Sequence, residues 1–127
     1  MEYIEDDKAQ RLVDVFPGVG GQVNVAYHHD TNVITAWHKH EFQTDRIICL
    51  KGSFKVGLVF DDERLVWLYA SDKNQQVITA SAGVWHGWRA VEPGSIMLYH
   101  MSTFYDPDDI QKAPPDSFGA VWFPEDG

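Results

Sequence analysis

Residues 37–53, WHKHEFQTDRIICLKGS, decide how the rest of the chain is interpreted. His38 and His40 lie two positions apart in a segment of strand character, so both imidazoles point to one face, about 7 Å apart. Asp45 follows and opens a second apolar run, which a Lys-Gly turn ends. A buried imidazole or carboxylate needs a hydrogen bond, a metal or a polar ligand. This stretch therefore predicts the functional site.

Short strands extend on both sides of this stretch. Alternating or continuous apolar runs predict them at residues 12–16, 22–27, 33–40, 45–50, 53–60, 64–69, 76–79, 84–91 and 95–101. Turn residues separate the runs at intervals of roughly 8 to 12 residues, and no sustained helical period occurs before residue 105. The pattern is typical of an all-β sandwich or barrel.

The two ends of the chain differ from this middle part. Residues 1–10 are rich in charge and predict a loose N-terminal arm. Residues 106–127 contain four prolines together with Phe118, Trp122 and Phe123. Aromatic residues near a terminus usually pack against a protein surface. We therefore expect an irregular tail that docks on its own barrel or on a partner subunit. Residues 1–127 are expected to form one domain.

Composition excludes several classes of function. The net charge is −9, with 10 basic and 19 acidic residues, so no basic stripe is available for a nucleic-acid backbone. A small phosphorylated ligand remains possible, because one arginine such as Arg46 suffices to bind it. No apolar run reaches the ~20 residues of a membrane span. The single Cys49 and an N-terminus without a signal-peptide pattern predict a cytoplasmic protein.

A third histidine, His86, follows Gly83 and could meet the first two across a barrel. The order His-x-His-x4-Asp-x6-Gly and then Gly-x-x-His resembles the two metal motifs of the cupin superfamily, over roughly residues 33–101. The resemblance implies a double-stranded β-helix, the jelly-roll barrel. It also implies a metal site of His38, His40, Asp45 and His86 for Fe, Mn, Ni or Zn. The cupin carboxylate is usually a glutamate, and the expected proline is Ser81.

A second resemblance concerns residues 98–107, LYHMSTFYDP. They look like a segment of the dTDP-4-dehydrorhamnose 3,5-epimerases, in which the residue matching Tyr99 is the catalytic acid and a second tyrosine matches Tyr105. The histidine base of that family falls on His38. Residues 49–53, CLKGS, similarly resemble a strand end of the dTDP-sugar 3,4-ketoisomerases. Both families transfer protons beside a ketone and need no metal.

The chain departs from these families at two positions. The epimerase arginine three residues before the histidine is Thr35 here, and the active-site lysine would fall on Asp45. That substitution reverses the charge where an enolate oxygen should be stabilised.

Ordinary structural roles compete with each of these assignments. The histidines could hold a polar pocket together through hydrogen bonds alone, and Tyr99 could be a half-buried strand tyrosine. Tryptophans could stack on a base or a sugar, but more often they fill a barrel or an interface. The residues that we expect to bind substrate are His40, Arg46, Trp85, Trp88 and Tyr105.

Three functions follow from the sequence. The first is an epimerase or isomerase of a sugar nucleotide, a 4-keto-6-deoxyhexose, with His38 as base, Tyr99 as acid and no cofactor. The second is a metal-dependent cupin, an oxygenase or a small-molecule isomerase. The third is a ligand-binding cupin without catalysis. In each case we expect a homodimer formed through β-strand contacts and the aromatic tail.

Overall fold

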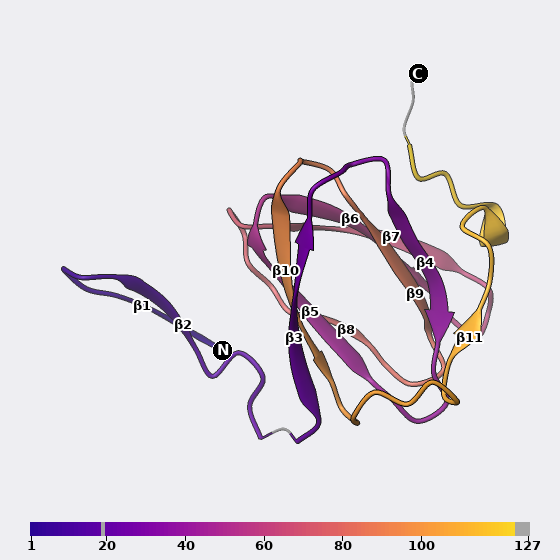
Figure 1. Ribbon diagram of the computed structural model, residues 1–127, viewed down its shortest axis with the longest axis horizontal. Coiled ribbons are helices and arrows are strands. Elements are labelled where there is room, and N and C mark those ends of the chain that lie inside the picture. Colours follow the sequence, from indigo (N-terminus) through magenta and orange to yellow (C-terminus); the bar gives the residue numbers. More distant parts are fainter. Residues whose placement is uncertain (19, 124–127) are drawn as a thin grey trace.

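Two antiparallel sheets face each other in the computed structural model, which describes residues 1–18 and 20–123 (Figure 1). The first has the strand order β3-β10-β5-β8, formed by Gln22–His28, Ser95–Met101, Asp45–Lys51 and Ile78–Ala80. The second has the order β11-β4-β9-β6-β7, formed by Gln111–Lys112, Ile34–Lys39, Trp85–Ala90, Ser53–Val59 and Leu65–Ser71. This is the all-β jelly-roll architecture that the sequence predicts.

The core lies between the two sheets. It contains Ile47, Cys49 and Met97 from the four-stranded sheet, and Phe54 and Val56 from the five-stranded sheet. These residues alternate with outward-facing ones along their strands, as expected for a strand with one face against the core. Burial raises the pKa of the Cys49 thiol to about 11, so this cysteine behaves as a small apolar core residue.

An irregularity in β4 decides which of its residues face the core side. The pairing of β4 with β9 shifts register between Thr35 and His38. Because of this bulge, both residues line the space between the sheets although they lie three positions apart. Trp37 points to the opposite side, where it packs against Trp67 and Trp122.

The N-terminal segment contains a β-hairpin. Strand β1, Glu2–Glu5, pairs with β2, Gln10–Val13, and the hairpin extends away from the barrel (Figure 1). The second strand ends at Val13, so the strand that the sequence predicts at residues 12–16 is placed too late in the chain.

The C-terminal tail packs on the outer face of the five-stranded sheet. The indole N–H groups of Trp37 and Trp122 both donate to the Pro115 carbonyl, at 3.1 and 2.8 Å. Strand β11 and the short 3-10 helix η1, Ser117–Gly119, belong to this tail. The sequence predicts a docked tail that reaches residue 127. Its last four residues lie outside the part of the chain that the structure describes. Within the described residues, no helix has the length and apolar character needed to cross a membrane.

Candidate active site

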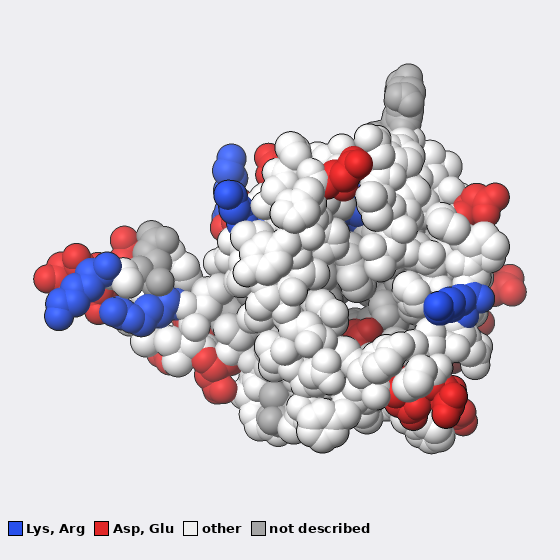
Figure 2. All heavy atoms as spheres, in the orientation of Figure 1, with Lys and Arg blue, Asp and Glu red and all other residues white. Residues whose placement is uncertain are grey.

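A cavity of about 230 Å³ opens between the two sheets. Its walls come from both sheets and from the segment that follows β10. Figure 2 shows a hollow near the centre of the face that carries β3 and β10. The lining residues are Thr35, His38, His40, Gln43, Asp45, His86, Trp88, Tyr99, Met101, Tyr105 and Ile110.

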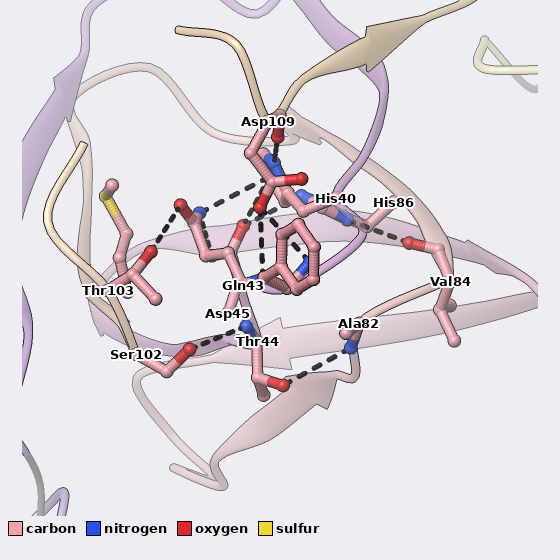
Figure 3. A network of polar contacts seen from close by, with 12 residues as sticks. His40, Gln43, Thr44, Asp45, Ala82, Val84, His86, Ser102, Thr103 and Asp109 are labelled. Atoms are coloured by element: carbon pink, nitrogen blue, oxygen red, sulfur yellow. Dashed lines mark hydrogen bonds and ion pairs between the residues drawn. The ribbon is translucent and has the colours of Figure 1, made fainter. Parts of the chain in front are cut away.

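Asp45 is the centre of a buried polar network in this cavity (Figure 3). Its Oδ2 atom lies 2.9 Å from His86 Nε2 and 3.4 Å from His40 Nε2. Its Oδ1 atom accepts a hydrogen bond from the Gln43 amide at 2.5 Å. Thr103 in turn donates to the Gln43 carbonyl oxygen, which fixes the orientation of the amide. The carboxylate therefore has donors on both oxygens.

These contacts shift the pKa of both Asp45 and His40. Burial opposes ionisation of Asp45, but the hydrogen bonds from His40 and His86 outweigh it and hold the pKa well below the usual range. Burial also disfavours a charged His40, yet the hydrogen bond to Asp45 raises its pKa. The network thus keeps a carboxylate charged inside a cavity that would otherwise favour the neutral acid.

Backbone carbonyls hold the far side of both imidazoles. His40 Nδ1 lies 2.6 Å from the Asp109 carbonyl, and His86 Nδ1 lies 3.2 Å from the Val84 carbonyl. A carbonyl only accepts, so Nδ1 carries a proton in both rings. Each Nε2 atom faces Asp45. It donates a hydrogen bond to the carboxylate when the ring is doubly protonated, and it presents a lone pair to a metal when the ring is neutral.

Asp109 also clamps the turn between β4 and β5. Its carboxylate accepts hydrogen bonds from the successive backbone N–H groups of Glu41, Phe42 and Gln43, at 2.7 to 3.2 Å. Burial raises the pKa of this carboxyl, but the three N–H groups lower it by more. One residue of the tail therefore positions both the His40 ring and the Gln43 backbone.

The arrangement fits a divalent transition metal at three of the four predicted ligands. The ligand atoms of His40, Asp45 and His86 lie within 4.8 Å of one another. Metal-bound histidines usually donate their second N–H to a carbonyl or carboxylate, as both imidazoles do here. These three residues would hold the ion, which would supply Lewis-acid or redox chemistry. His38 is outside this group, with its ring centroid 6.4 Å from that of His86.

His38 has a different environment from the other two histidines. It occupies the cavity wall on β4, opposite His86 in register. Burial lowers its pKa, and the charges of His86 and Lys112 lower it further. A neutral imidazole at neutral pH has a lone pair available to accept a proton.

Aromatic side chains form a further part of the cavity wall. Tyr99 enters from β10, and its ring centroid lies 6.3 Å from that of Trp88 on β9. The Trp88 indole donates to His28 Nε2 at 3.0 Å, which fixes the plane of the indole. Tyr105 lines the mouth and is largely exposed. Both Trp88 and Tyr105 are among the residues expected to bind substrate.

Two other expected substrate contacts lie outside the cavity. Trp85 is next to His86 and so points to the other side of β9, where it packs against Phe118 and Lys39. Arg46 lies on the outer side of β5, next to the His100 ring. Neither residue lines the cavity in this structure.

Sequence analysis did not find Gln43, Asp109 or His28. Gln43 precedes Asp45 by two residues, a spacing that places both side chains on the same face of an extended chain. That signal was available. Asp109 lies 69 residues from His40 in a segment without periodicity, so no local pattern could connect the two.

The solved structures that are similar to this chain include an epimerase and a ketoisomerase. The chain is 18% identical to the 3'-monoepimerase ChmJ from Streptomyces bikiniensis, with a TM-score of 0.85 over 98% of this chain and 73% of ChmJ. It is 20% identical to the sugar 3,4-ketoisomerase QdtA from Thermoanaerobacterium thermosaccharolyticum, with a TM-score of 0.73 over 88% of this chain and 83% of QdtA. At these identities the likeness establishes the fold.

Sequence comparison establishes the family. The chain is 30% identical to a probable low-salt glycan biosynthesis epimerase, Agl13, from Haloferax volcanii, over 89% of this chain and 83% of the relative. The sequence model of the family described as "FdtA: WxcM-like, C-terminal" matches residues 19–118. That match includes both β4 and β10, which carry His38 and Tyr99. The chain therefore belongs to the FdtA family, WxcM-like, C-terminal.

Proposed function

We propose that this member of the epimerase- and isomerase-like cupins acts on a nucleotide-linked 4-keto-6-deoxyhexose by proton transfer between His38 and Tyr99. The observation that carries the proposal is the placement of these two residues. His38 comes from the five-stranded sheet and Tyr99 from the four-stranded sheet, and both line the same cavity. A sugar between them would have a base on one side and an acid on the other.

The first step is removal of a carbon-bound proton next to the ketone. The neutral imidazole of His38 takes the proton, and the C–H electron pair forms an enolate whose negative charge rests on the ketone oxygen. The Tyr99 hydroxyl then donates a proton to the enolate from the opposite side. Solvent returns the two side chains to their starting protonation states. The lowered pKa of His38 keeps the base in its competent form at neutral pH.

The Asp45 network orients the base side of the cavity in this mechanism. His86 is in register with His38 across β4 and β9 and is itself held by Asp45. The ligands of two structural neighbours support a nucleotide sugar as ligand. ChmJ has been solved in complex with dTDP-quinovose and QdtA in complex with TDP.

The test uses dTDP-4-keto-6-deoxyglucose in D₂O. We expect the wild-type protein to incorporate deuterium at the carbon next to the ketone and to form an epimer or keto-isomer, both measured by NMR. His38→Asn should abolish exchange. Tyr99→Phe should lower product formation by at least about 100-fold while exchange continues.

Tyr27→Phe is the matched control, because this tyrosine is exposed on the outer side of β3. Exchange that persists in His38→Asn would rule out His38 as the base. Binding of the sugar nucleotide without exchange in the wild type would instead support the ligand-binding cupin without catalysis.

A metal-dependent reaction is the second candidate function. The converging nitrogen and oxygen atoms of His40, Asp45 and His86 favour it. In that case the ion would replace the hydrogen bonds that now link Asp45 to the two rings, and His38 would remain beside the site as a proton acceptor.

We also propose that the protein is a homodimer. The outer side of the edge strand β3 exposes Val23, Val25 and Tyr27. Neither β3 nor its neighbour β10 contains an acidic residue, although the net charge of the chain is −9. An apolar face without like charge in an acidic protein suits contact with a second copy.

A further inference from the structure

Among the residues that the structure describes, the wall of the cavity carries no basic side chain apart from histidine. The proposed ligand carries a diphosphate, and Asp45 adds a negative charge in the same space. Binding two phosphate groups generally requires lysine, arginine or a metal ion. A cation must therefore reach the ligand from the edge of the cavity.

Most basic residues of the chain are committed elsewhere. Lys55 and Arg89 are buried on the outer face of the five-stranded sheet, where they donate to the Trp122 carbonyl. Lys39 lies over the outward-facing Trp85 ring, and Arg46 lies beside His100. Lys8 and Arg11 are in the N-terminal hairpin. Lys51 is at the end of β5 remote from Asp45, and Lys73 is in a turn. Arg64 lies beside an aspartate.

Lys112 is placed differently. It is directly opposite His38 in the antiparallel pairing of β11 with β4, and directly opposite residues direct their side chains to the same face of a sheet. His38 lines the cavity, and so does Ile110, two residues before Lys112. The Lys112 side chain therefore leaves the sheet on the cavity side.

Lys112 is accessible to a ligand because it is exposed and has no acidic partner among the described residues. The residue is exposed at the edge of the sheet, and no acidic group among residues 1–18 and 20–123 forms an ion pair with it. In Figure 2 basic atoms lie over the edge where Figure 1 places β4 and β11, next to the hollow. The flexible four-carbon stem of lysine lets the ammonium group move over the cavity mouth.

We propose that Lys112 is the cation that binds the phosphate groups of the ligand at the mouth of the cavity. The inference rests on the proposed function and deepens it, since it assigns the anionic part of the substrate to the β11 side. The sugar would then extend from Lys112 past His38 toward Tyr99.

Titration calorimetry with dTDP tests the inference on the full chain. Lys112→Gln should weaken dTDP binding by at least about tenfold, and Lys112→Glu should weaken it further. The affinity of the wild type should fall with added salt, and this dependence should be smaller in Lys112→Gln. Thymidine, which lacks phosphates, should bind the wild type and Lys112→Gln equally.

Lys39→Gln is the matched control, because Lys39 is also next to His38 but lies on the outer side of β4. Its dTDP affinity should stay within about twofold of the wild type. Equal affinities for Lys112→Gln and Lys39→Gln would overturn the role of Lys112 and leave the proposed function intact. A wild-type protein that does not bind dTDP at all would overturn both. Both lysine positions are outside the core, so the variants should fold, which thermal melts would verify.

Discussion

Asp45 falls where the resemblance to the dTDP-4-dehydrorhamnose 3,5-epimerases implies a lysine, and its surroundings explain how the carboxylate is tolerated. Two imidazole nitrogens and one amide face its oxygens. A buried carboxylate without these donors would become neutral. The effect of these partners on Asp45 should be visible in the pH dependence of stability.

The first prediction concerns Asp45→Asn. The Asp45 pKa is lowered on folding, so its charge stabilises the protein above about pH 4 and that contribution is lost as the pH falls. The His40 pKa is raised, so its contribution is present below about pH 6.5 and is lost as the pH rises. Urea unfolding of the wild type should show greatest stability between these limits. Asp45→Asn should flatten the profile, and an unchanged profile would contradict the assigned pKa shifts.

The second prediction tests which of the four predicted residues bind a metal ion. If the metal-dependent alternative holds, protein incubated with Mn(II) or Fe(II) should retain the ion through His40, Asp45 and His86. Elemental analysis should then find near-stoichiometric metal in the wild type and in His38→Ala, but not in His86→Ala. Loss of the ion in His38→Ala would show that the ligand set includes all four predicted residues.

At the scale of elements, the turn between β4 and β5 depends on a residue from the distant tail. The Asp109 carboxylate holds three successive N–H groups of this turn, and the Asp109 carbonyl holds the His40 ring. The turn carries Gln43 into contact with Asp45. The position of the tail at Asp109 therefore determines where His40 and Gln43 lie relative to Asp45.

The third prediction follows from this clamp. Asp109→Ala should speed hydrogen exchange at the amides of Glu41, Phe42 and Gln43, because their acceptor is lost. Activity should fall several-fold, since Gln43 and His40 lose their support. Asp109→Asn keeps one acceptor oxygen and should restore part of the protection. Equal exchange in all three proteins would show that the turn is held by other contacts.

At the scale of the whole molecule, charge and apolar surface are separated. The acidic residues lie outside strands β3 and β10, whose outer side is apolar. The distribution favours assembly through the four-stranded sheet.

The fourth prediction tests the dimer. Tyr27→Asp places a charge on the outer face of the four-stranded sheet and should convert the dimer to a monomer in sedimentation velocity. Tyr69→Asp is the control, because Tyr69 is on the other sheet and has almost the same exposure, 67% against 64% for Tyr27. A dimer that survives Tyr27→Asp, or a wild-type monomer, would exclude this interface.

Periodicity predicted the parts of the structure that local sequence determines. Alternation identified the main strands and the shared inward face of His38 and His40. The same rule separates Trp88 from Trp85. Trp88 is two residues from His86 and faces the same side of β9, whereas Trp85 is next to His86 and faces the opposite side. The bulge at Thr35, the clamp by Asp109 and the contact of His28 with Trp88 depend on tertiary pairing. No single segment contains that information.

The distribution of the indoles has an optical consequence. Trp37, Trp67, Trp85 and Trp122 belong to the cluster under the C-terminal tail, and Trp88 is the one tryptophan on the cavity wall. The emission of the native protein is thus mainly a reporter of tail docking, and ligand binding changes only the Trp88 component. A Trp88→Phe variant should keep the emission of the tail cluster and lose the change on ligand addition. The two signals make undocking of the tail and occupation of the cavity measurable in one fluorescence titration.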